Sequence, residues 1–127
     1  MFNDAAKFNA DVSKWNTSKV TDMTKAFRQA AVFNADISKW DTSRVTSLDH
    51  TFAQASVFNA DISKWNTSKV TTLEKTFNYA YQFNQNIGKW VLATQIAKVV
   101  HLVEFYIQQI HFNVLFVVRG TFNLFHN

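Results

Sequence analysis

Apolar and polar positions repeat along the first 90 residues with a period of 25. A repeat of this length is typical of a solenoid, in which each unit buries its apolar face only by stacking on copies of itself. We therefore expect residues 1–90 to form about three and a half coils around a shared core. The aromatic residues expected in that core are Phe8, Phe33, Phe58, Phe83, Trp15, Trp40, Trp65, Trp90, Phe27, Phe52 and Phe77.

Half of each unit has the spacing of a short helix. Four apolar residues follow one another at steps of three, four and three: Val45, Leu48, Phe52 and Ala55. This spacing places them on one helical face. Thr71 and Glu74 have the spacing of a capping box at a helix start. The pattern predicts a helix over residues 46–55, with equivalents over 21–30 and 71–80.

The other half of each unit is too short for a second helix. Residues 36–40 fit a short extended segment, and residues 41–43 fit a turn, because Asx, Ser and Thr side chains bond the backbone in turns. Equivalent turns are expected at residues 16–18 and 66–68. The predicted fold class is therefore α/β: a short leucine-rich-repeat-like solenoid with one short strand and one short helix per 25-residue coil.

The repeat also carries a family resemblance. The string Phe-Asn-x-Asp-Ile-Ser-x-Trp-Asp/Asn-Thr-Ser-x-Val-Thr-x-Met/Leu, followed by Phe and Ala, resembles the BspA-like leucine-rich repeat, a 25-residue surface repeat of the mycoplasma-lipoprotein type. The resemblance covers residues 1–90, and the last copy departs from it at Asn86 and Gly88. It implies a tandem array on a cell surface or in a secreted protein, with adhesion or protein binding as its role. It brings no catalytic residues.

Both ends depart from a complete repeat array. Met1 and Phe2 align with the middle of a unit, which predicts that the chain is a piece of a longer array. The non-repeat apolar segment 91–127 has three interpretations: translated noncoding sequence, a C-terminal cap with a helix over 91–107, and a membrane anchor. We rank them in that order, since its longest charge-free run, residues 105–118, is shorter than the roughly 20 residues of a spanning helix.

Composition narrows the function only slightly. The chain has no Cys, which excludes disulfides and thiolate metal sites. Its net charge of +4 permits anionic partners but falls short of a nucleic-acid-binding signature, so we expect no nucleic-acid partner. The first residues lack the basic and apolar regions of a secretory signal. An extracellular or cell-surface location is implied by the resemblance alone.

Two columns of basic residues are the clearest candidate interaction site. Stacking would align them into stripes able to follow an anionic polymer, a carbohydrate or an anionic surface. The alternative, which we favour, is that they are solvated flanks, partly neutralised by Asp11, Asp36 and Asp61. The two columns are Lys14, Lys39, Lys64 and Lys89, and Lys19, Arg44 and Lys69.

Three further polar columns follow the same period. A regular threonine array on a flat face could bind ice, although capping and turn roles explain these threonines better. The column of Asn residues predicts an internal ladder in which side chains bond the backbone of the next coil. Asn16 and Asn66 begin glycosylation sequons on predicted turns. The columns are Thr17, Thr42 and Thr67; Thr21, Thr46 and Thr71; and Asn9, Asn34, Asn59 and Asn84.

Nothing in the sequence forms a catalytic constellation. The four histidines, at positions 50, 101, 111 and 126, lack the spacing of a metal site, and there is no phosphate loop or nucleophile elbow. We therefore predict a non-enzymatic scaffold without cofactors that binds a protein partner or a cell surface through one repeated face. The alternatives are an anionic-polymer or carbohydrate binder, an ice binder, and a degenerate product without a function of its own.

Overall fold

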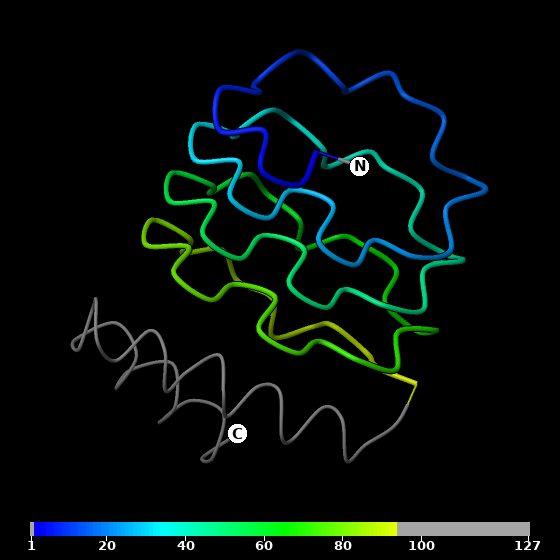
Figure 1. Ribbon diagram of the computed structural model, residues 1–127. Coiled ribbons are helices and arrows are strands. Elements are labelled where there is room, and N and C mark those ends of the chain that lie inside the picture. Colours follow the sequence, from blue (N-terminus) through cyan, green and yellow to red (C-terminus); the bar gives the residue numbers. More distant parts are fainter. Residues whose placement is uncertain (1, 94–127) are drawn as a thin grey trace.

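The computed structural model describes residues 2–93, which form a single stack of coils (Figure 1). Each 25-residue unit makes one turn of the chain and lies directly on the unit before it. In this part of the chain there is no helix, and strand pairing is limited to two isolated parallel bridges, Asp22 to Ser47 and Ser47 to Thr72. The prediction of an α/β fold with a strand and a helix in each coil is therefore wrong.

Left-handed backbone conformations prevent the expected helix over residues 46–55. His50 has a φ of 54° and Gln54 a φ of 61°, whereas a helix needs every φ near −63°. The two equivalent segments are interrupted at the same places. The left-handed residues there are Lys25, Gln29, Lys75 and Tyr79.

The backbone N–H groups of this segment alternate between two kinds of acceptor. Every second one closes a tight turn within the coil, as the Ala55 N–H does to the Phe52 carbonyl at 3.0 Å. From Leu48 onward the others donate to the next coil, as the His50 N–H does to the Glu74 carbonyl at 2.8 Å. A chain of turns thus keeps the 3-4-3 apolar spacing on the inside and satisfies its donors between coils instead of within a helix.

The predicted extended segment 36–40 is also wrong, whereas the predicted turn after it is confirmed. The Ser38 N–H donates to the Asp36 carboxylate at 2.9 Å, and the Trp40 N–H closes a turn to the Ile37 carbonyl at 3.2 Å. The Ser43 N–H likewise donates to Asp41 at 3.0 Å. Short Asx turns therefore occupy this half of the coil, because each Asp or Asn offers its own backbone a nearby acceptor.

Stacked phenylalanine rings fill the centre of the coils. The Phe27 ring lies 5.6 Å from the Phe52 ring of the next coil and 4.0 Å from Phe33 in its own coil, in stacked geometry. The later coils repeat this arrangement, with Phe52 and Phe58 centroids 3.9 Å apart. These rings are fully buried, so the hydrophobic effect and ring packing together hold the coils in register.

A tryptophan column forms the second part of the core. The indole Nε1–H of Trp40 donates to the Val12 carbonyl of the preceding coil at 3.0 Å, and Trp65 and Trp90 do the same to residues 37 and 62. These three side chains are at most 7% exposed. Trp15, in the first coil, is 43% exposed. Each buried tryptophan therefore contributes both apolar area and a bond between coils.

The stack continues slightly beyond the last sequence repeat. The Thr67 hydroxyl donates to the Val91 carbonyl at 2.8 Å, and the Ala93 N–H donates to the Val70 carbonyl at 2.9 Å. The predictions for the remainder of segment 91–127, whether cap, anchor or noncoding sequence, lie outside the described residues. In residues 2–93 no helix is long and apolar enough to cross a membrane.

Candidate interaction face

Both predicted basic columns lie on the surface of the stack. All seven side chains are exposed: Lys14, Lys39, Lys64 and Lys89 in one column, and Lys19, Arg44 and Lys69 in the other. Within residues 2–93 the ion pairs are Arg28–Asp4 and Lys75–Glu74, so neither column takes part in one. Their ammonium and guanidinium groups are therefore available to an anionic partner.

Aspartates accompany the first basic column. Hydrogen bonds from Ser38 lower the pKa of Asp36 below its usual value, and the nearby Lys39 ammonium lowers it further. Asp11 and Asp61 show the same lowering of their pKa by Ser13 and Ser63, with Lys14 and Lys64 contributing. The first column is therefore a mixed stripe of both signs. Three residues before Arg44 of the second column, hydrogen bonds from Ser43 likewise lower the pKa of Asp41.

The threonine columns stabilise the stack. The Thr17, Thr42 and Thr67 side chains are at most 7% exposed, and their hydroxyls donate to backbone carbonyls of the following coil at 2.8–3.1 Å. Because residues 2–93 contain no helix, the predicted capping role of Thr21, Thr46 and Thr71 is wrong. Thr46 and Thr71 instead donate their hydroxyls to the preceding threonine carbonyl at 3.1 and 3.2 Å.

The predicted asparagine ladder is present. The Asn34 N–H donates to the Asn9 side-chain oxygen at 2.9 Å, and the same bond links Asn34 to Asn59 and Asn59 to Asn84. The ladder lies at the surface rather than in the interior, since Asn9, Asn34 and Asn84 are exposed. Its amide oxygens therefore serve the fold, at the edge of the coils.

The two sequons, Asn16-Thr17-Ser18 and Asn66-Thr67-Ser68, each begin at an exposed Asn. Asn16 and Asn66 are exposed, and each accepts a hydrogen bond from the backbone N–H two residues later. The hydroxyl residues that a glycosylation enzyme must recognise are Ser18 and Ser68, and each donates its hydroxyl to the side-chain oxygen of its own Asn at 2.7 Å. Ser18 is partly exposed and Ser68 is exposed, so both ends of each sequon lie at the surface.

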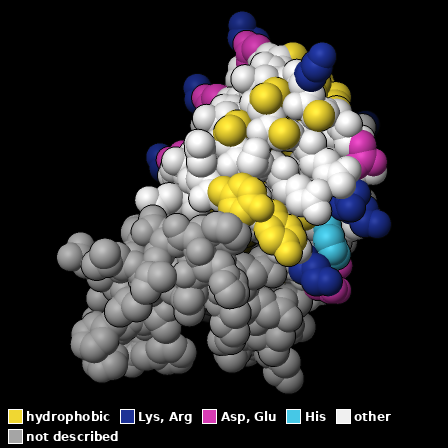
Figure 2. All heavy atoms as spheres, turned by 60° about the vertical axis from the view of Figure 1, so that its left-hand side comes forward, with side chains coloured by type: hydrophobic (Ala, Val, Ile, Leu, Met, Phe, Trp, Pro, Cys, Tyr) yellow, Lys and Arg dark blue, Asp and Glu magenta, His cyan; other side chains and the backbone are white. Residues whose placement is uncertain are grey.

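One exposed feature was missed by sequence reasoning. Tyr79 and Tyr81 are 48% and 49% exposed, and their ring centroids lie 6.1 Å apart at an angle of 60°. Together with Gln54 they line an open hollow of about 370 Å³. Figure 2 shows two ring-bearing apolar side chains next to one another on this face, with Lys or Arg and His side chains near them in the view. The available signal was the break in the repeat, because aromatic rings replace small or polar residues at these two positions.

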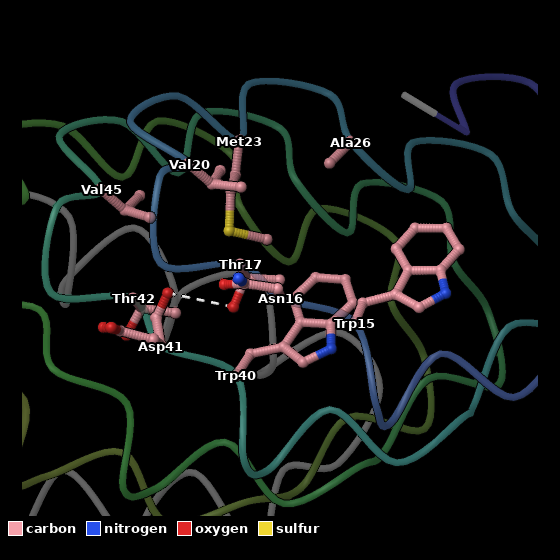
Figure 3. Close-up of a pocket in the computed structure, with 10 residues that line it drawn as sticks. All are labelled: Trp15, Asn16, Thr17, Val20, Met23, Ala26, Trp40, Asp41, Thr42 and Val45. Carbon is pink, nitrogen blue, oxygen red and sulfur yellow. Dashed lines mark hydrogen bonds between the residues drawn. The ribbon is translucent and has the colours of Figure 1, made fainter.

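A smaller cavity lies inside the stack, between the first two complete coils. It measures about 100 Å³, and Figure 3 shows the Trp15 and Trp40 rings side by side at one end of it. Its lining is mainly apolar, and the Thr17 hydroxyl at its wall already donates to the Asp41 carbonyl. Ala26, which borders it, stands where later coils carry the larger Thr51 and Thr76. We interpret this cavity as imperfect packing between the two coils.

Ionisable groups in the described part do not gather into a metal or catalytic cluster. No group of three or more His, Asp or Glu side chains could hold a metal ion within residues 2–93. His50, the histidine in this range, is partly exposed and stands in the column of Lys25 and Lys75. What the face offers is therefore repeated charge, hydrogen-bonding groups and one aromatic pair.

Comparison with known proteins identifies the family of this chain, and the function of that family is unknown. A model for a mycoplasma protein family of unknown function, DUF285, matches residues 1–114. The match extends past the last clear repeat. Among curated proteins no sequence matches. No solved structure matches either.

Proposed function

The chain belongs to the DUF285 family, and on that premise we propose that it is a non-enzymatic binding scaffold whose repeated face contacts a protein or a cell surface. Its architecture is of the solenoid type, and the BspA-like motif of the repeat supports a surface role. The observation that carries the proposal is the recurrence of exposed residues at equivalent positions, as in the basic columns, of coils that lie one on another (Figure 1). Solenoids use such extended surfaces for binding.

The division of side-chain types between the interior and the surface of the stack supports this role. The aromatic rings fill the interior, and the buried threonine hydroxyls bond neighbouring coils. The exposed basic residues outside Arg28 and Lys75 make no ion pair within residues 2–93. The basic side chains therefore remain exposed on the outer face, where a partner can reach them.

A binder of an anionic polymer is the second candidate, and the column Lys19, Arg44 and Lys69 favours it. Adjacent coils bring equivalent groups close together, as the centroid distances of 5.6–5.8 Å in the Phe27–Phe52–Phe77 ladder show. A row of cations at such a spacing attracts a chain of regularly placed anions. Ice binding is the weaker alternative, because the Thr17 column is buried.

The experiment that separates the first two candidates is a salt titration of binding. The full chain is immobilised and exposed to surface proteins, and the captured protein is then purified and titrated. In parallel, heparin serves as the anionic-polymer probe. Under the main proposal one protein binds with an affinity that changes less than about threefold between 50 and 500 mM salt, whereas polymer binding would weaken steeply.

A matched pair of triple variants provides the control. Lys19→Gln/Arg44→Gln/Lys69→Gln removes the second column, while Lys7→Gln/Lys25→Gln/Lys75→Gln removes the same charge elsewhere. Polymer binding along the column would weaken stepwise in the first series and less in the second. Equal, weak effects in both series together with salt-insensitive protein binding support the main proposal. If neither a protein nor heparin binds, the binding-scaffold proposal fails.

A further inference from the structure

Two asparagines in the Asx turns carry a chemical group that the turn itself does not require. Asn16 and Asn66 occupy the position that Asp41 holds in the coil between them. All three residues accept the backbone N–H of the serine two residues later, at 3.2, 3.1 and 3.0 Å respectively. Because a carboxylate forms the same turn as an amide, the turn does not account for the amide nitrogen of the two asparagines.

These amide nitrogens take no part in holding the described coils together. In both asparagines the side-chain oxygen, Oδ1, accepts the bonds of the turn, from the serine N–H and from the serine hydroxyl at 2.7 Å. Neither amide nitrogen, Nδ2, makes a hydrogen bond to the residues that the structure describes. Because Asn16 and Asn66 are exposed, a group attached to Nδ2 breaks no hydrogen bond of these coils.

The same two asparagines are the ones in this chain that begin an Asn-X-Ser/Thr sequence. Other exposed asparagines, such as Asn9, Asn34 and Asn84, are followed two residues later by Asp or Asn. In an Asn-X-Ser/Thr sequence the transferase recognises the hydroxyl of the third residue, and the amide of the first accepts the sugar. The motif therefore coincides with the exposed turns in which the amide nitrogen is available.

The geometry of the Asx turn favours reaction at the amide nitrogen. When Nδ2 attacks a sugar it loses a proton, and negative charge develops on Oδ1. The N–H and hydroxyl of Ser18, or of Ser68, already point at that oxygen and stabilise the developing charge. These bonds join residues two apart, so the turn forms without a neighbouring coil. The middle residues, Thr17 and Thr67, are 7% and 2% exposed, so a transferase can surround the sequence only before the coil closes.

We propose that Asn16 and Asn66 are N-glycosylation sites, each carrying one sugar or sugar chain on Nδ2. The co-substrate is a sugar whose anomeric carbon, C1, is activated as a phosphate or diphosphate ester. The Nδ2–C1 bond forms, the C1–O bond to phosphate breaks, and the phosphate leaves with the electron pair. The Nδ2 proton passes to a base of the transferase. The inference rests on the surface role in the proposed function, because such sequences are glycosylated in secreted proteins.

The test is mass spectrometry of the full chain isolated from the cells that produce it. Peptides that contain Asn16 and Asn66 are fragmented with the modification intact, so that it is assigned to one side chain. We expect a sugar on both residues and none on Asn9 or Asn34. An attached oligosaccharide identifies a lipid-linked donor, and a single hexose identifies a nucleotide-linked donor.

The repeat supplies matched variants for loss and for gain of a site. Asn16→Asp/Asn66→Asp keeps both turns, as Asp41 shows, and should abolish both attachments without lowering the melting temperature below that of the deglycosylated parent. Asp41→Asn gives the middle coil the sequence Asn-Thr-Ser in the same turn and should add a third sugar. Ser18→Ala/Ser68→Ala keeps both amides but removes the hydroxyl, and should reduce occupancy at least about tenfold.

Two results would overturn the glycosylation sites. One is an unmodified Asn16 and Asn66 in all of the recovered chain, and the other is a sugar on a serine or threonine oxygen of the same peptides instead. Labelling intact cells with a membrane-impermeant amine reagent shows in parallel whether the chain lies at the surface. A labelled chain without sugar ends the inference and leaves the proposed function standing. A chain that is neither labelled, secreted nor glycosylated ends the surface role as well.

Discussion

At the scale of single residues, short polar side chains define the path of the backbone. Asp36 accepts the N–H of Ser38, and Asn86 does the same for Gly88 at the equivalent place in the last coil, at 3.0 Å. An Asx side chain thus forms the same turn in every coil, whether it is an acid or an amide. The acidic version adds a dependence on pH that the amide lacks.

Acid should weaken the stack through its turn aspartates. Because hydrogen bonds lower the folded-state pKa of Asp11, Asp36 and Asp61 below the usual 3.8, their stabilisation is complete above that value and is lost as pH falls through the folded pKa. We expect the melting temperature to drop between about pH 4 and pH 2. In the variant Asp11→Asn/Asp36→Asn/Asp61→Asn the drop should be shallower. Parallel melting curves against pH would contradict this.

The left-handed residues offer a second test at this scale. His50 has a φ of 54°, a conformation that glycine adopts without steric penalty. His50→Gly should therefore raise the free energy of unfolding by about 0.5–1 kcal/mol, measured by urea denaturation. Lys39→Gly, at an exposed position without a positive φ, should lower it by about the same amount. A loss of stability in both variants would show that φ at residue 50 carries no strain.

At the scale of the coil, hydrogen bonds between neighbouring coils replace those of a helix. Among the side chains that make such bonds are three regular columns: the indoles of Trp40, Trp65 and Trp90, the hydroxyls of Thr17, Thr42 and Thr67, and the amide oxygens of Asn9, Asn34 and Asn59. Each repeats once per coil and reaches one neighbour. A single substitution in a column therefore affects one interface between coils and leaves the others intact.

Two tryptophans of one column should differ in their importance. Trp65 is 4% exposed and donates to the Ile37 carbonyl, while Trp15 is 43% exposed. Trp65→Phe should lower the free energy of unfolding by about 2 kcal/mol, through a cavity and an unpaired carbonyl. Trp15→Phe should cost less than about 0.5 kcal/mol. Denaturant titrations of both variants measure the difference, and equal losses would argue against the bond between coils.

At the scale of the whole molecule, the stack is not uniform along its axis. The cavity of about 100 Å³ lies beside Val20 in the first coil. Val20 is half-buried, whereas Val45 and Val70 at the equivalent positions are each 1% exposed. Local stability follows packing and burial, so the first complete coil should open more readily than the two that follow.

Hydrogen exchange should reveal this gradient. The N–H groups of Val20, Val45 and Val70 make the same bond, to the threonine carbonyl three residues before, at 2.9–3.0 Å. We expect the Val20 amide to exchange at least about tenfold faster than the other two, since only its surroundings differ. The three matched amides serve as one another's control. Equal protection would show that the molecule opens only as a unit.

The sequence by itself determined the repeat, the buried aromatic residues apart from the exposed Trp15 and the partly buried Phe8, and the position of the Asx turns. These follow from local chemistry and from a period of 25 that any fold of this chain has to satisfy. It also indicated the asparagine ladder, because one polar residue per coil beside a core Phe can reach only its own copies. The same information predicted a helix over 46–55, since 3-4-3 apolar spacing is the usual sign of one.

Only the tertiary structure decided against that helix. A 3-4-3 spacing is compatible with any backbone that returns every third or fourth side chain to the core. The neighbouring coils supply the hydrogen-bond donors and acceptors that a helix would otherwise provide within itself. Residues such as His50 and Gln54 accept a left-handed φ because neighbouring coils hold their N–H groups. For the same reason the meeting of Tyr79, Tyr81 and Gln54 depends on how the coils align, which no local pattern contains.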